Sequence, residues 1–204
     1  PFTPVADVMA PSPGKIIGSG KAGYLVSHEV NDSFILSNRL LKAGEGVYWV
    51  KTATKAGGKA FAPGALWIPA TPANRAILEK ATAELGVDAY AVAKAPVGET
   101  LKLKPVRVGL VDKYGGVMTS GWTRWLMEQF EFDYQVVYPQ RLDAGDIAKD
   151  FDVLVFTNGV LPSVGGEGYG GRQPKAEDIP AEFRGWLGEI TPAKTAPQIA
   201  AFLQ

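Results

Sequence analysis

The sequence predicts an α/β protein with a Rossmann-like or flavodoxin-like, mainly parallel sheet. Short apolar segments alternate along the chain with segments of helical periodicity, a pattern that favours parallel strands joined by helical crossovers. Residues 151–156 form a near-continuous apolar run, as expected for a strand buried on both faces. Between an apolar strand at 106–111 and a helix at 120–130 lies a glycine-bearing loop, which is typical of a strand–loop–helix unit.

The first part of the chain begins with a segment rich in proline and glycine, residues 1–22, which we interpret as a linker or extended strap. Two helices are expected next: one after the N-cap signal at Asn31 with a stop at Gly44, and one after Thr71-Pro72 with a stop at Gly86. The AGGK turn at 56–59 predicts a hairpin between flanking strands. The expected strands cover residues 15–17, 24–27, 47–51, 66–69 and 90–93.

The second part of the chain repeats the strand and helix alternation after a boundary at 96–105. The helix at 120–130 carries Trp122, Leu126 and Phe130 at a spacing of four residues, so we expect this apolar face to pack on the sheet. Strands are expected at 106–111, 135–138 and 151–156, and helical segments at 144–149, 179–188 and 197–204. The glycine-rich segment 158–175 lacks apolar periodicity and predicts a long loop or lid.

Composition excludes several classes of function. The chain has 204 residues, 46% hydrophobic and 21% charged, with a formal net charge of zero, so it shows no electrostatic signature of nucleic-acid binding. No apolar run approaches the ~20 residues of a membrane-spanning helix. The absence of cysteine excludes disulfides, thiolate metal sites and a cysteine nucleophile within these residues. A lone histidine leaves little material for a metal centre, so neither a catalytic residue nor a metal ligand is assigned.

Three regions follow from these patterns: the linker at 1–22, an N-terminal α/β half with a hairpin at 23–104, and a second α/β half at 105–204. The sequence starts at Pro1 rather than methionine and stops at Gln204 within a helical pattern. We therefore expect it to be part of a longer polypeptide in which the linker follows another domain.

The strand–loop–helix unit holds the candidate ligand site. Ligands of open α/β sheets collect at the carboxyl ends of strands, where amides at a helix start favour anions. The candidate residues, which would take a small polar or anionic ligand, are Asp112, Tyr114, Gly115, Gly116, Ser120, Gly121 and Arg124. This hypothesis predicts that Arg124→Ala and Gly116→Val abolish binding without unfolding the protein. The simpler interpretation is a tight turn without a ligand, because the loop lacks the full spacing of a phosphate-binding fingerprint.

Several segments resemble the region that follows the catalytic domain in a bacterial subgroup of zinc carboxypeptidases, the carboxypeptidase A-like family. They are GYLVSHEVNDSF, LLKAGEGVYWV, LKLKPVRVGL and YGGVMTSGWTRWLMEQFEFDYQVVYPQRLDAGDIAKDFDVLVF. The resemblance implies a class I glutamine-amidotransferase-like domain, incomplete at its C-terminal end. It also implies a parent protein that removes C-terminal residues from peptides, with zinc in a preceding peptidase domain of the same polypeptide, and export to the periplasm or cell exterior.

The residues of the chain do not supply the zinc site of that family. Such a site needs histidine and carboxylate ligands around an open position, and Asn31 stands where the glutamate of a His-x-x-Glu pair with His28 would be. We therefore expect zinc only in the parent's peptidase domain and interpret His28 as an ordinary hydrogen-bonding side chain.

Two functions remain open at this point. The chain is either a non-catalytic accessory region of the zinc carboxypeptidase-like protein, or an amidotransferase- or amidohydrolase-like enzyme domain whose nucleophile lies beyond Gln204. The second alternative uses the resemblance of the strand at 151–156 and Asn158-Gly159 to the segment that supplies oxyanion-hole amides in amidotransferases.

Overall fold

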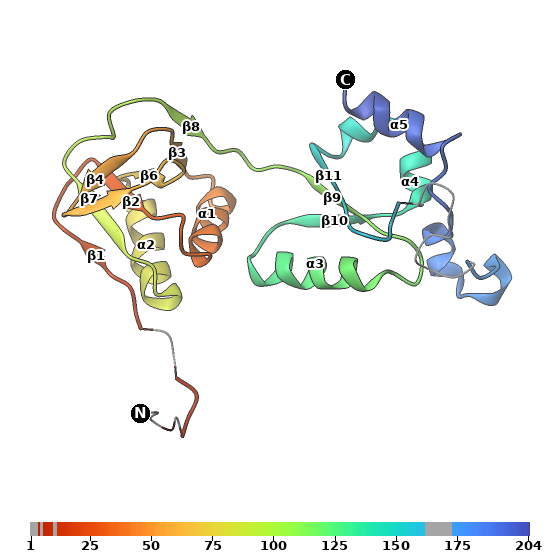
Figure 1. The fold of residues 1–204 in the computed structure, drawn as a ribbon, viewed down its shortest axis with the longest axis horizontal. Helices are drawn as coiled ribbons and strands as arrows, with labels where there is room; N and C mark the ends of the chain where they lie inside the picture. The colour runs from red at the N-terminus through yellow and green to blue at the C-terminus, as the bar shows by residue number, and fades with distance from the viewer. Residues whose placement is uncertain (1–3, 5, 10–11, 162–172) are drawn as a thin grey trace. The chain divides into compact units, whose positions relative to one another are not determined.

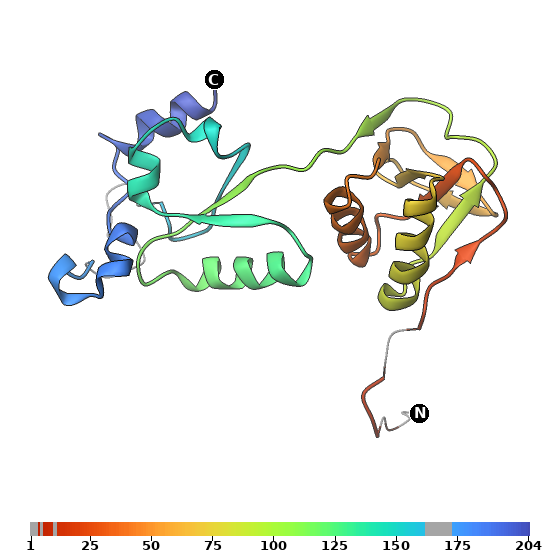
Figure 2. The same cartoon turned by 180° about the vertical axis from the view of Figure 1, so that it is seen from behind.

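The computed structural model describes residue 4, residues 6–9, residues 12–161 and residues 173–204. The chain divides into two compact units, residues 1–105 and 106–204. Figures 1 and 2 show their elements from opposite sides. Each unit has its own sheet and its own buried clusters of side chains, so each is described by itself.

The first unit is built on a six-stranded sheet with the order β1-β7-β2-β6-β3-β8. Its strands are β1 (Ile16–Ile17), β2 (Gly23–Val26), β3 (Tyr48–Val50), β6 (Leu66–Pro69), β7 (Ala89–Val92) and β8 (Thr100–Lys102). Only β1 and β7 pair in parallel, while the other four pairings are antiparallel. The expectation of a mainly parallel sheet is therefore wrong for this unit.

The crossovers explain the mixed sheet. Helix α1 (Asp32–Lys42) connects β2 to β3, and helix α2 (Pro72–Leu85) connects β6 to β7. Each crossover joins two strands that run in the same direction, but a strand from the other crossover lies between them. This interleaving is the split β-α-β arrangement of ferredoxin-like topology. An alternating pattern in the sequence predicts the crossovers but does not tell which strands become neighbours.

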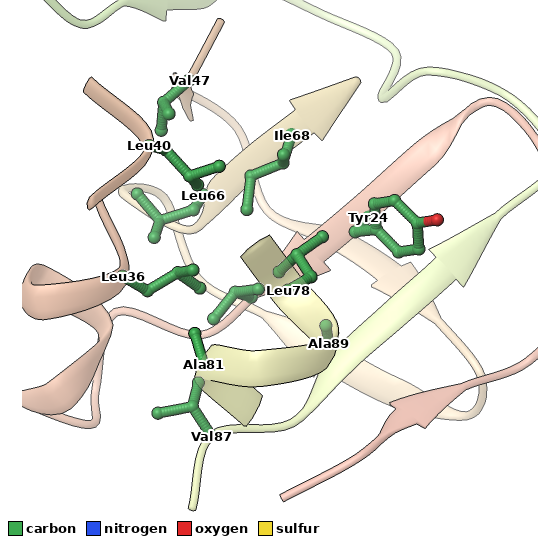
Figure 3. Close-up of a cluster of buried hydrophobic side chains, with 11 residues drawn as sticks. Tyr24, Leu36, Leu40, Val47, Leu66, Ile68, Leu78, Ala81, Val87 and Ala89 are labelled. Carbon is green, nitrogen blue, oxygen red and sulfur yellow. The ribbon is translucent and has the colours of Figure 1, made fainter. Parts of the chain in front are cut away.

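Helices α1 and α2 cover one face of this sheet. Figure 3 shows Leu36 and Leu40 of α1 and Leu78 and Ala81 of α2 beside sheet residues such as Ile68. Thr71 caps α2 as predicted, because its hydroxyl accepts the Asn74 N–H at 3.0 Å, and Gly86 ends the helix in the left-handed conformation. Asn31 precedes α1 but its side chain makes no capping hydrogen bond.

The opposite face of the sheet carries a second buried cluster, which includes Leu25, Phe61 and Trp67. Phe61 belongs to a separate two-stranded hairpin of β4 (Thr54–Ala56) and β5 (Lys59–Phe61), which turns at Gly57-Gly58. This hairpin lies in the sequence between β3 and β6, which pair with each other in antiparallel fashion. The predicted turn is thus the tip of an inner hairpin within a wider strand pair.

The second unit contains a parallel three-stranded sheet with the order β10-β9-β11. Its strands are β9 (Val108–Val111), β10 (Tyr134–Val137) and β11 (Val153–Phe156). Helix α3 (Met118–Gln129) connects β9 to β10 and lies along one face of the sheet in Figures 1 and 2. On the other face lie helix α4 (Pro139–Asp143), the 3₁₀ helix η1 (Ile147–Lys149) and helix α5 (Thr195–Phe202). The described part of the unit also contains the 3₁₀ helices η2 (Ala176–Asp178) and η3 (Ala181–Trp186).

The orientation of α3 contradicts the sequence expectation. Trp122 and Leu126 do not pack on the sheet: their side chains are 62% and 48% exposed. Ser120 is instead the buried residue of this helix, while Met127 and Phe130 are half-buried. The helix also begins at Met118 rather than at Ser120, and Val117 occupies the N-cap position without a side-chain cap. The apolar spacing was a correct sign of a helix, but it did not identify the face that meets the sheet.

The amino ends of β9 and β11 are joined by an ion pair between Arg107 and Asp152. The guanidinium donates to both carboxylate oxygens, at 2.7 Å and 3.1 Å, and the Arg107 backbone N–H donates to Oδ2 at 2.9 Å. The side-chain hydrogen bonds from Arg107 are the largest cause, followed by its backbone hydrogen bond, of a pKa of Asp152 that is lowered to about 2. The pair ties together two strands that are distant in sequence.

None of the helices in the described residues combines the length and the apolar character required to span a bilayer. The predicted loop at 158–175 falls largely on residues 162–172, which lie outside the described residues.

The Arg107–Asp152 pair predicts a specific pH dependence of stability. Because the carboxyl pKa is about 2 in the folded state and about 3.9 in an unfolded chain, the pair stabilises the fold fully above pH ~4. That stabilisation is lost as the pH falls from about 4 toward 2. Urea unfolding of Asp152→Asn across this window should therefore show a shallower loss of stability than the unchanged protein. Glu182→Gln, at an exposed carboxyl, is the control, and equal slopes for all three proteins would contradict the role of the pair.

Candidate functional site

The candidate site lies at the carboxyl edge of the parallel sheet, where β9, β10 and β11 all end. We name this region the carboxyl edge; its residues are Asp112, Lys113, Tyr114, Gly115, Gly116, Thr119, Ser120, Tyr138, Thr157, Asn158, Gly159 and Gln173. Because the three strands are parallel, residues that follow each of them come to the same edge. The residues after β9 are those predicted from the sequence, and the same rule identifies Tyr138 after β10 and Thr157 after β11.

A buried hydrogen bond between Ser120 and Asp112 organises this edge. Asp112 directly follows β9 and is only 2% exposed, and its backbone N–H donates to the Val137 carbonyl at 3.0 Å. The Ser120 hydroxyl donates to Oδ2 of Asp112 at 2.6 Å, and the Lys113 backbone N–H donates to Oδ1 at 2.8 Å. A buried carboxylate requires such partners because desolvation of an unpaired charge is costly. The bond therefore links the end of β9 to the first turn of α3.

Two successive glycines allow the chain to turn between Asp112 and α3. Gly115 and Gly116 have φ values of +83° and +68°, which side-chain-bearing residues rarely adopt. The Gly116 N–H donates to the Lys113 carbonyl at 2.8 Å and closes the turn. Gly116→Val would strain this backbone, so it would not test ligand binding separately from the fold. The glycines have a conformational function whether or not a ligand binds here.

The loop after β11 is tied to the same place. The Thr119 hydroxyl donates to the Asn158 carbonyl at 2.5 Å, and Nζ of Lys113 donates to the Gly159 carbonyl at 3.4 Å. The Asn158 carbonyl thus faces the first turn of α3, and the Gly159 carbonyl faces the side chain of Lys113 in the loop before that helix. Asn158-Gly159, whose sequence resembles an oxyanion-hole segment, uses these carbonyl oxygens as acceptors within the protein.

Two buried side-chain oxygens at this edge lack a hydrogen-bond partner among the described residues. They are Oγ1 of Thr157 and Oε1 of Gln173. Thr157 directly follows Phe156, whose register partner on β9 is Val111, so Thr157 lies beside Asp112. Gln173 donates through its amide nitrogen to the Tyr114 carbonyl at 3.2 Å. Because buried polar atoms are almost always satisfied in native proteins, two unsatisfied oxygens at one edge require an explanation.

Tyr138 forms the side of the carboxyl edge that follows β10. Its ring stacks on Trp186 of η3, with ring centroids 4.9 Å apart and planes 9° apart. Burial, and next the negative charge of Asp112, raise the pKa of Tyr138 above its usual value. The phenol therefore stays protonated at neutral pH and keeps an O–H that can donate.

The remaining predicted site residues, Gly121 and Arg124, make their hydrogen bonds away from this edge. The Gly121 N–H donates to the Val117 carbonyl at 3.1 Å, and the residue faces open space, so its amide is not left for a ligand. Arg124 lies farther along α3, where a hydrogen bond with Tyr134 raises the pKa of its guanidinium. Tyr134 in turn donates to Glu128 at 2.7 Å. Arg124 is thus part of a hydrogen-bond network on α3 and β10, and its charge partly offsets the rise in the pKa of Tyr138.

The described residues of the carboxyl edge include neither a histidine nor a cluster of metal-binding side chains. Within the described part of the chain, no group of three or more His, Cys, Asp or Glu side chains could hold a metal ion. His28 belongs to the first unit, where its ring lies about 3.4 Å from the position that a Cβ on Gly64 would take. Its Nδ1 is buried without a hydrogen-bond partner among the described residues.

Comparisons of the chain with protein-family models, with curated proteins and with solved structures give no match. The resemblance to the region after a zinc carboxypeptidase domain therefore rests on the sequence segments alone and stays a prediction.

Proposed function

We propose that the chain is a non-catalytic accessory region of a zinc carboxypeptidase-like protein, and that its second unit binds a small polar ligand at the carboxyl edge. The observation that carries the ligand-binding part is the pair of buried oxygens of Thr157 and Gln173 that have no hydrogen-bond partner among the described residues. A ligand with N–H or O–H groups would satisfy both oxygens and recover the free energy that their desolvation costs. Neutral Tyr138 supplies a donor on the same edge.

The hydrogen bonds of Asp112 support a non-catalytic role. Both of its carboxylate oxygens already accept hydrogen bonds, from the Ser120 hydroxyl and from the Lys113 amide. A general base must reach a proton of the substrate, and a nucleophile must be activated by a base beside it. Here the carboxylate is 2% exposed and the serine proton is directed to it, so the pair positions the loop and the helix.

We also propose a Rossmann-like, class I glutamine-amidotransferase-like identity for the second unit. It is supported by a central strand β9 with parallel neighbours on both sides and by a ligand edge at the strand ends. The sequence resemblance supports the remaining features: a preceding peptidase domain as partner, zinc in that domain, and an exported parent.

Ligand binding is tested with free L-amino acids, which are the products of a carboxypeptidase and carry an ammonium donor. We expect one of them to bind the 204-residue chain in isothermal titration, and Thr157→Val to weaken that binding at least about tenfold, the scale of a hydrogen bond to a charged group. Thr157→Val should leave the free protein no less stable, since Oγ1 has no hydrogen-bond partner in the described part of the chain.

Thr54→Val, in the hairpin of the first unit, is the matched control and should bind as the unchanged chain does. If no amino acid binds, or if Thr157→Val binds normally, the ligand-binding proposal is wrong.

The accessory role is tested by assaying zinc content and C-terminal residue release for the full-length protein and for the 204-residue chain. Zinc and activity are expected in the full-length protein only, because the chain has one histidine and no cysteine for a metal site. A full-length protein without zinc, or a 204-residue chain that itself hydrolyses peptides, would contradict this role.

A further inference from the structure

The face of α3 that points away from its own sheet is apolar and uncharged. Met118, Trp122 and Trp125 lie on it and are 81%, 62% and 49% exposed. At 3.6 residues per turn, these three residues and Gln129 fall within about 60° of arc, opposite the inward-facing Ser120 and Met127. We call this face, with Gly121 and Leu126 at its sides, the outer stripe of α3. A surface helix normally carries charged or polar residues on its outward face, whereas the outward face of α3 carries large apolar side chains.

The area of the outer stripe is suited to a protein interface. For large side chains of about 200 Å² each, the exposed fractions of Met118, Trp122, Trp125 and Leu126 correspond to on the order of 500 Å² of apolar surface. A stable dimer buries about 800 Å² on each partner, of which roughly 65% is apolar at a homodimer interface. The stripe therefore supplies the apolar core that such a dimer needs, and neighbouring polar groups can supply its rim.

The order of residues along the stripe favours a second copy of the same chain. In an antiparallel helix pair with two-fold symmetry, residues meet across the axis when they lie on the same side of the interface and their distances from the helix midpoint agree within about one residue. The midpoint here lies between Thr123 and Arg124. Met118 then meets the partner's Gln129, and Leu126 meets the partner's Trp122.

Gly121 gives this pairing its complementary shape. On the other side of the stripe, Trp125 meets the partner's Gly121, where a Cβ would find no atom within 4 Å. A large ring thus faces a position without a side chain, as in packing of a knob into a hole. Trp122 and Trp125 already hold a perpendicular arrangement within one copy, with ring centroids 5.8 Å apart. No like-charge repulsion arises between the two outer stripes, because none of the residues in the stripe is ionisable.

We propose that the chain forms a symmetric homodimer through the outer stripe of α3, with the two helices antiparallel. The proposal is independent of ligand binding at the carboxyl edge, which lies at the other side of the Ser120–Asp112 bond.

Sedimentation velocity of the 204-residue chain tests the dimer. The 21.7 kDa chain should shift to twice that mass between about 1 and 100 µM. Gly121→Leu should raise the dimer dissociation constant at least about tenfold, because it fills the position that receives a tryptophan of the partner. The same variant should keep its fold, since Gly121 faces open space in one copy and glycine is a poor helix former. Gly185→Leu, also directed at open space in the second unit, is the control.

Single cysteines test the antiparallel direction, because the natural chain has none. Met118→Cys and Gln129→Cys chains should cross-link efficiently when they are mixed and oxidised, and poorly when either is oxidised alone. Efficient cross-linking of each variant alone would overturn the antiparallel arrangement. A chain that stays monomeric over the whole concentration range, or equal effects of Gly121→Leu and Gly185→Leu, would overturn the dimer itself.

Discussion

The hydrogen bond from Ser120 to Asp112 is the constraint on which the second unit depends. It satisfies a carboxylate that is 2% exposed, and it joins the end of the central strand to the first turn of α3. Because Ser120 must face the sheet to make this bond, the rotation of α3 about its axis is fixed. Trp122 and Trp125, which lie on the other side of the same helix, are then turned toward solvent. One polar contact thus determines both the shape of the carboxyl edge and the exposure of an aromatic surface.

The two edges of the parallel sheet are organised differently. At the amino edge, Arg107 and Asp152 form a saturated ion pair whose hydrogen bonds join β9 to β11. At the carboxyl edge, Thr157 and Gln173 retain buried oxygens without partners among the described residues. Buried polar groups that are fully hydrogen-bonded stabilise a structure. Buried polar groups that stay unpaired in a native fold are found frequently at functional sites. This contrast is the physical basis for the proposed ligand site.

The sequence predicted local features better than it predicted their partners. The cap at Thr71, the left-handed stop at Gly86 and the strand before Asp112 follow from short-range chemistry and are present. The neighbours of β2 and the rotation of α3 depend on contacts between distant segments, which periodicity does not encode. A serine in an amphipathic helix looks like a poor core residue until its acceptor is known, so the importance of Ser120 for packing was not visible. Thr157 could have been found by applying the strand-end rule to every parallel strand.

The measurement that tests this account most directly is a double-mutant cycle on Asp112→Ala and Ser120→Ala, with urea unfolding followed by tryptophan fluorescence. If the buried hydrogen bond holds α3 on the sheet, the two substitutions should be strongly non-additive, with a coupling free energy of about 1.5–3 kcal/mol, as for hydrogen bonds to a charged group. Additivity within about 0.5 kcal/mol would contradict the central role of the bond, and the orientation of α3 would then require another cause.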